Sequence, residues 1–104
     1  MNHKLTVLIA AAALSLPVLS LQADEVKALW EKKCALCHGA DGSGKAAMKT
    51  KNYTDAKVQA DMKDDAILKA IKDGVDGSKM KGYVGKLSDD EIKALATHIR
   101  SFKK

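Results

Sequence analysis

The chain has 104 residues, of which 18 are Lys or Arg and 13 are Asp or Glu, and its net charge at pH 7 is +5. This length allows one domain at most. Two cysteines are too few for a disulfide framework, and one Trp, two Tyr and one Phe do not provide the basic and aromatic surface of a nucleic-acid-binding protein.

The first 23 residues have the pattern of a secretory signal peptide. Lys4 provides a short positive start, residues 5–14 are almost wholly apolar, and Ala23 precedes the charged pair Asp24 and Glu25. The apolar run is shorter than the ~20 residues that a membrane-spanning helix needs. We therefore predict a signal peptide at residues 1–23, one domain at residues 24–104 and export to the periplasm. The alternative is a membrane anchor formed by an uncleaved signal.

Apolar residues recur at helical spacing at the start of the predicted domain. Val26, Leu29, Trp30, Cys34 and Cys37 predict a helix over residues 25–37. This helix leads directly into the sequence Cys-Ala-Leu-Cys-His at residues 34–38. A glycine-rich loop is expected to follow.

The rest of the chain predicts three further helical segments and no strand. A short one follows Asp55, and a second begins at Asp64 and ends at Gly74. Residues 74–86 contain four glycines and predict an irregular loop. Ser88 and Glu91 form a capping box before the clearest helix, at residues 89–102. Because no stretch alternates like a strand, we predict an all-α domain whose first and last helices cross.

The motif formed by Cys34, Cys37 and His38 carries the functional prediction. A redox-active dithiol usually follows a strand, a structural zinc site needs four ligands, and a local disulfide would leave His38 without a role. Cysteines three residues apart can each form a thioether bond with a vinyl group of haem, and the adjacent histidine then ligates the iron. We therefore predict one covalently bound haem c.

These residues give the chain a resemblance to the small monohaem class I c-type cytochromes. The resemblance rests on Trp30 four residues before the first cysteine, on Cys-Ala-Leu-Cys-His-Gly and the following Asp-Gly-Ser-Gly, on Met80 between glycines, and on the closing segment from Leu87 to Phe102. It implies the cytochrome c fold, with three to four helices and loops wrapped around one haem. It also implies Met80 as the axial ligand opposite His38.

Two other methionines compete with Met80 for this ligand position. Met48 follows His38 after only a short stretch of chain, and Met62 is expected to fill the core. Met80 lies in the glycine-rich loop, which allows a close approach to the haem, and a thioether opposite histidine raises the reduction potential. The alternatives to Met80 are Met62, a histidine or an open sixth position.

The chain departs from the family at three places. Members usually have a proline about a dozen residues after the ligand histidine, and its carbonyl accepts the proton of the far ring nitrogen. Residues 45–52 contain no proline, so we expect another backbone carbonyl of this stretch to accept that proton. Lys81 stands where a proline often follows the ligand methionine, which predicts a less rigid loop. His98 stands where the last helix often has an aromatic residue, and we expect it to pack there without a functional role.

These features predict an electron carrier and not an enzyme, because no catalytic acid, base or nucleophile is apparent. A haem sensor or a peroxidase-like protein with a labile sixth ligand is the alternative. Lysines near the expected haem edge predict redox protein partners with acidic faces, and we expect neither nucleic acid nor a small-molecule substrate. Tyr53 and Lys51 are candidate hydrogen-bond donors to the haem propionates. The lysines expected near the haem edge are Lys32, Lys33, Lys45, Lys49, Lys51, Lys79, Lys81 and Lys86.

Overall fold

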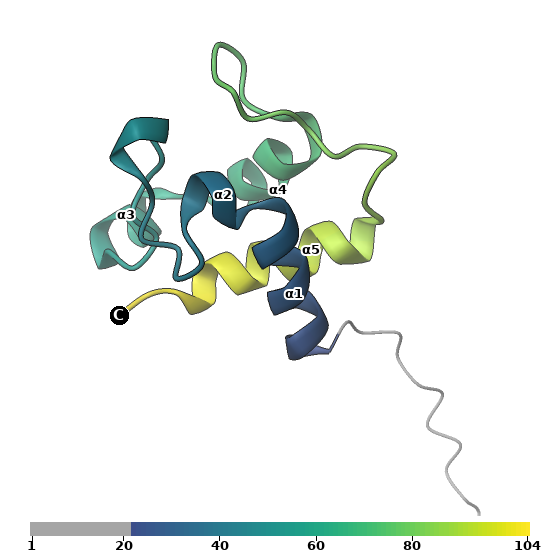
Figure 1. Ribbon diagram of the computed structural model, residues 1–104, viewed down its shortest axis with the longest axis horizontal. Coiled ribbons are helices and arrows are strands. Elements are labelled where there is room, and N and C mark those ends of the chain that lie inside the picture. Colours follow the sequence, from purple (N-terminus) through teal and green to yellow (C-terminus); the bar gives the residue numbers. More distant parts are fainter. Residues whose placement is uncertain (1–21) are drawn as a thin grey trace, which may run out of the picture.

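The computed structural model describes residues 22–104 as helices joined by loops (Figure 1). The helices are α1 (Ala23–Lys33), α2 (Ala35–His38), the 3-10 turn η1 (Ala46–Met48), α3 (Ala56–Asp61), α4 (Asp64–Asp73) and α5 (Asp89–Ser101). Within these residues there is no β-strand, and two isolated bridges join Gly74 to Lys81 and Val84 to Leu87. The all-α prediction is confirmed. The predicted signal peptide, residues 1–23, lies outside the described residues except for its last two positions.

The first predicted helix, residues 25–37, is divided in two at Cys34. The backbone of Cys34 leaves the helical conformation, with φ −120° and ψ −33°. Its N–H still donates to the carbonyl of Trp30 at 2.8 Å, and its carbonyl accepts from the N–H groups of Cys37 and His38 at 3.2 Å and 3.0 Å. The prediction of one continuous helix was wrong at this residue, because the spacing of apolar residues is not sensitive to one non-helical position.

The later helices begin and end where local sequence features predict. Asp55 caps α3 by accepting two backbone N–H bonds, and α4 ends at Gly74, whose φ of 77° favours glycine. The predicted capping box at α5 is present, with Glu91 N–H donating to the Ser88 hydroxyl at 3.1 Å and Ser88 N–H donating to the Glu91 carboxylate at 2.9 Å. The η1 turn was not predicted, and it is followed by Lys49, a residue in the left-handed conformation.

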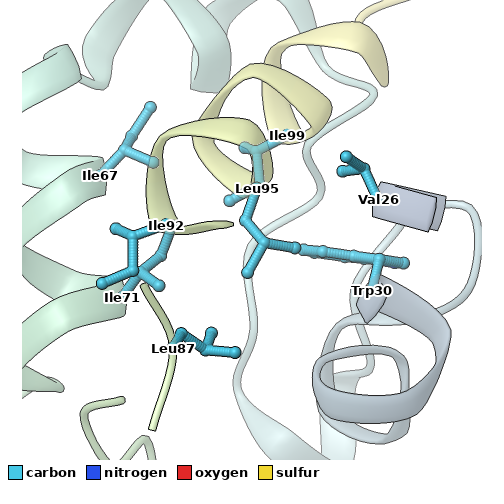
Figure 2. Packing of buried hydrophobic residues seen from close by; sticks show 8 residues of the cluster. All are labelled: Val26, Trp30, Ile67, Ile71, Leu87, Ile92, Leu95 and Ile99. Atoms are coloured by element: carbon cyan, nitrogen blue, oxygen red, sulfur yellow. The ribbon is translucent and has the colours of Figure 1, made fainter. Parts of the chain in front are cut away.

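Helix α5 is the centre of the fold, because α1 and α4 both pack against it (Figure 1). Figure 2 shows Trp30 of α1 and Leu95 of α5 pointing toward one another, and each is only 1% exposed. The predicted crossing of the first and last helices is therefore confirmed. The buried apolar core consists of Val26, Trp30, Ile67, Ile71, Leu87, Ile92, Leu95 and Ile99.

His98 packs at the crossing of α1 and α5. Its ring centroid lies 5.7 Å from that of Trp30 and 4.7 Å from that of Phe102. Burial lowers the pKa of His98, the charge of Lys27 lowers it further, and the charge of Glu31 raises it. His98 is therefore a neutral packing residue at pH 7, in agreement with the sequence prediction.

A buried polar network ties the C-terminal end of α5 to the segment around α3. Gln59 is 5% exposed, and its Nε2 donates to the carbonyls of Tyr53 and Ile99 at 2.7 Å and 2.8 Å. The Arg100 guanidinium donates to the carbonyls of Gln59 and Met62, both at 2.6 Å. Because buried polar groups are costly unless they are paired, this Gln59–Arg100 network holds residues 53–62 against α5. Two residues of this segment reach the site described next.

Candidate functional site

A cavity of about 520 Å³ lies among α1, α2, η1, α4, α5 and the loops that connect them. Cys34, Cys37, His38 and Met80, the site residues that the sequence singles out, all line it. Apolar side chains of the core, among them Ile71, form part of its wall. Two thiols, one imidazole and one thioether sulfur around an apolar cavity are the donors that a haem bound through two thioether bonds and two axial ligands requires. The residues present therefore fit this group.

Hydrogen bonds from outside the motif hold its turn in place. The indole Nε1 of Trp30 donates to the carbonyl of Gly39 at 2.9 Å, and the hydroxyl of Thr50 donates to the carbonyl of Cys37 at 2.7 Å. Gly44 allows the loop after the motif to fold back closely, because a Cβ atom there would lie 2.7 Å from the carbonyl oxygen of Thr50. The turn is thus held from α1 on one side and from the segment after η1 on the other.

The environment of Cys34 differs from that of a reactive thiol. Burial and, to a smaller extent, the charge of the nearby Cys37 raise the pKa of the Cys34 thiol to about 11. Reactive dithiols depend on a lowered thiol pKa, so this environment disfavours the dithiol alternative. Across residues 22–104, no group of three or more His, Cys, Asp or Glu side chains is placed so that it could hold a metal ion.

The imidazole of His38 has two aromatic neighbours. Its centroid lies 5.5 Å from that of Tyr53 in a stacked arrangement, with 18° between the planes, and 5.7 Å from that of Trp30. Burial lowers the pKa of His38, which favours the neutral ring that a metal ligand requires. Its Nδ1 is buried and has no hydrogen-bond partner among the described residues. The expectation that a carbonyl of residues 45–52 accepts this proton was therefore wrong.

Met80 lies in a loop that is closed by its own hydrogen bonds. The N–H of Val75 donates to the carbonyl of Met80 at 3.1 Å. The N–H of Met80 donates to the hydroxyl of Ser78 at 3.1 Å, and this hydroxyl donates to the carbonyl of Val75 at 2.7 Å. A Cβ atom at Gly74 would lie 2.7 Å from the carbonyl oxygen of Met80, so the loop packs closely on the end of α4. These contacts restrain the loop although Lys81 replaces proline.

The same cavity contains the other two candidate thioethers and a group of lysines. Met48 and Met62 both line it, so all three methionines named from the sequence meet there. Tyr53, a candidate partner of the haem propionates, lines it as well. Among the described residues, no Asp or Glu lines the cavity, although its wall contains five lysines. These are Lys33, Lys49, Lys51, Lys79 and Lys81.

Three polar residues that shape the site were not identified from the sequence. Thr50 bonds to Cys37 across 13 residues, and Gln59 bonds to Ile99 across 40. Such long-range pairs leave no mark in a local pattern, and polar residues of this kind are mostly exposed. Ser78 is different, because a serine two residues before the ligand candidate is a turn signal that could have been recognised.

Comparison with known proteins places the chain in a family. Residues 21–99 match the sequence family described as "Cytochrome C oxidase, cbb3-type, subunit III". Cytochrome c-553 of Helicobacter pylori is 38% identical, over 81% of this chain and 84% of the relative. The chain belongs to the c-type cytochrome family.

Further c-type cytochromes show the same relationship. Cytochrome c-553 of Nitratidesulfovibrio vulgaris is 35% identical over 95% of this chain and 97% of the relative. The solved structure of the KustC0563 c-type cytochrome matches with a TM-score of 0.69 at 32% identity, and the match covers 75% of this chain and 96% of that one. The predicted cytochrome c fold is confirmed.

Membership of the c-type cytochromes also confirms the predicted cofactor and the general function. The cofactor is covalently attached haem c, and the protein is a small electron carrier rather than an enzyme. Electron transfer implies that its partners are redox proteins. In the described part of this cytochrome, no helix combines the length and the apolar composition that crossing a bilayer requires.

Proposed function

We propose that this c-type cytochrome carries electrons in the periplasm, with its haem bound through Cys34 and Cys37 and its iron ligated by His38 and Met80. The observation that carries the proposal is the meeting of these four side chains at one cavity. The haem, when bound, supplies a reversible one-electron change at iron. Keeping the same two ligands in both oxidation states limits the change in geometry that accompanies each transfer.

The backbone contacts of the three methionines favour Met80 as the second ligand. Met48 is the last residue of η1 and lies two residues before Thr50, whose hydroxyl bonds to the Cys37 carbonyl, so it belongs to the segment fastened to the attachment motif. Met80 belongs to a separate loop, which is fastened to α4 by the bond from Tyr83 N–H to the Ile71 carbonyl at 3.0 Å. Because the Met80 loop is attached to α4 and not to the attachment motif, Met80 can approach the cavity from a different side than His38. Met62 then has the role of a core-filling side chain.

The proposed location rests on the first 23 residues. Their basic start, apolar run and small residue before the charged Asp24 are the pattern of a cleaved secretory signal. Export suits the cofactor as well, because bacteria attach haem to the cysteine motif after secretion.

The mass of the purified protein, produced in a bacterial host that attaches haem, tests this assignment. We expect a chain that begins at Asp24 and carries one haem, with Cys34 and Cys37 both resistant to alkylating reagents. We also expect the reduced protein not to bind carbon monoxide at neutral pH, because both axial positions are filled. Two alkylated thiols in the secreted protein would overturn the attachment sites. Ready binding of carbon monoxide would favour the sensor or peroxidase-like alternative.

We further propose that the partners present acidic faces to the lysines of the cavity wall. Within residues 22–104, the cavity lining has five lysines and no acidic residue, which creates a positive potential around the haem. Such a field accelerates the approach of an anionic partner and is weakened by salt.

Reversing two of these charges is expected to change the rate of electron transfer according to the charge of the oxidant. For Lys49→Glu with Lys81→Glu, we expect the rate with anionic hexacyanoferrate(III) to fall on the order of 10-fold at low ionic strength. The rate with a cationic cobalt(III) complex should rise, and both effects should fade in high salt. The matched control is Lys69→Glu with Lys93→Glu, because both are exposed lysines outside the cavity lining. Equal effects of the two pairs in stopped-flow measurements would contradict a local role for the cavity lysines.

A further inference from the structure

In the part of the chain that the structure describes, the ring of His38 lacks the hydrogen bond that commonly fixes a ligand histidine. A metal-bound histidine usually donates its second ring N–H to an acceptor, and this bond sets the plane of the ring. Here Nδ1 has no such partner among the described residues. The side chain that lies most nearly parallel to the imidazole is Tyr53, at 5.5 Å between centroids and 18° between planes. This is the geometry of offset aromatic stacking.

The position of Tyr53 is fixed at both ends of its backbone. Its N–H donates to the carbonyl of Gly42 at 2.8 Å. Its carbonyl accepts from Nε2 of Gln59 at 2.7 Å, and the same Nε2 donates to the carbonyl of Ile99. Because Gln59 is itself buried and bonded to Arg100, the backbone of Tyr53 cannot move away from His38 without breaking this network.

We infer that Tyr53, held by Gln59, is the positioning residue that sets the plane of the His38 imidazole in this cytochrome. The inference rests on the proposed ligation of the haem iron by His38. A flanking ring that is nearly parallel to the imidazole resists rotation of the imidazole about its bond to the rest of the side chain. Trp30 adds a second restraint, since its ring is buried and its Nε1 is bonded to Gly39.

Electron paramagnetic resonance of the oxidised haem protein tests this role, because the g values of low-spin haem depend on the orientation of the axial ligands. We expect one low-spin signal for the wild type and for Tyr53→Phe, which retains the ring. For Tyr53→Leu we expect the signal with the largest g value to shift and broaden, or to divide into more than one species. A Tyr53→Leu spectrum identical to that of the wild type would overturn the inference.

The variant Tyr83→Leu distinguishes the loss of stacking on His38 from a general opening of the cavity to water. Tyr83 lines the same cavity, and its hydroxyl donates to the carbonyl of Lys33, but its ring makes no aromatic pair with His38 in the described structure. We expect Tyr83→Leu to change the reduction potential through water access while the g values stay at those of the wild type. Equal shifts of the g values in Tyr53→Leu and Tyr83→Leu would overturn the positioning role.

A further variant keeps the test decisive if Tyr53→Leu is not recovered with haem. Gln59→Met fills a similar volume but cannot donate to the Tyr53 carbonyl, so it is expected to broaden the same signal. Unchanged g values in Gln59→Met would then overturn the inference. Failure of the proposed function has a separate signature, because a wild-type protein with high-spin haem or with no covalent haem contradicts the ligation itself.

Discussion

Replacing Cys34 and Cys37 together by alanine is expected to abolish covalent haem attachment and to leave residues 24–104 without a stable fold. Among residues 22–104, the buried apolar core consists of only eight side chains, and several of them, among them Trp30, Ile67 and Ile71, also line the cavity. Without the haem, the apolar side chains that line the cavity would face water, and burial of apolar surface is the main favourable term in folding. The whole free energy of unfolding of a small domain is only about 5–15 kcal/mol.

Absorption of the haem after denaturation and circular dichroism of the folded protein measure the two effects. The matched control is Leu36→Ser, because Leu36 lies inside the motif but is 81% exposed, so its side chain supports neither the core nor the attachment. This control should keep both haem and helicity. A double alanine variant that retains native helicity and a cooperative thermal transition without haem would show that the protein core is sufficient by itself.

Replacing Met80 by alanine is expected to remove the sixth ligand while the haem stays attached. The thioether raises the reduction potential of the iron, so we expect the potential to fall by on the order of 100 mV. We also expect the oxidised protein to lose its weak sulfur-to-iron charge-transfer band and the reduced protein to bind carbon monoxide. Potentiometric titration and absorption spectra measure these changes.

Met48→Leu and Met62→Leu are the matched controls for Met80→Ala. Both residues line the same cavity, so these variants test a cavity thioether without removing the proposed ligand. We expect both to keep the charge-transfer band and to alter the potential only slightly. Loss of the band in either control, with retention in Met80→Ala, would transfer the ligand role to that methionine.

The elements that the sequence predicted best are those set by neighbouring residues. Ser88 and Glu91 form a capping box at the start of α5, and Gly74 ends α4. Each feature involves groups within one turn of a helix, so the local residues specify where the helix begins or ends. The break at Cys34 escaped prediction, because both halves of the divided helix keep the same apolar spacing. Element boundaries of this kind depend on hydrogen bonds that periodicity does not encode.

In the candidate site, the sequence likewise identified the local motif but not its surroundings. Cys34, Cys37 and His38 were recognisable as candidates, because two thioether bonds and an adjacent iron ligand would require these residue types at this spacing. The environment of His38 was not recognisable, and the expectation of a carbonyl acceptor for its Nδ1 was wrong. Tyr53, whose ring stacks on His38, belongs to a different segment of the chain, and Gln59 from a third segment bonds to its backbone.

The sequence by itself therefore determined the helical class and the covalent cofactor, and it named the motif at residues 34–38 as the candidate attachment site, because each depends on chemistry within a few positions of the chain. The tertiary structure decided how those residues are held. It joined Thr50 to Cys37, Gln59 to Ile99 and Tyr53 to the plane of His38. These contacts form only when distant segments close around one cavity, and their geometry is set by packing, which no local pattern records.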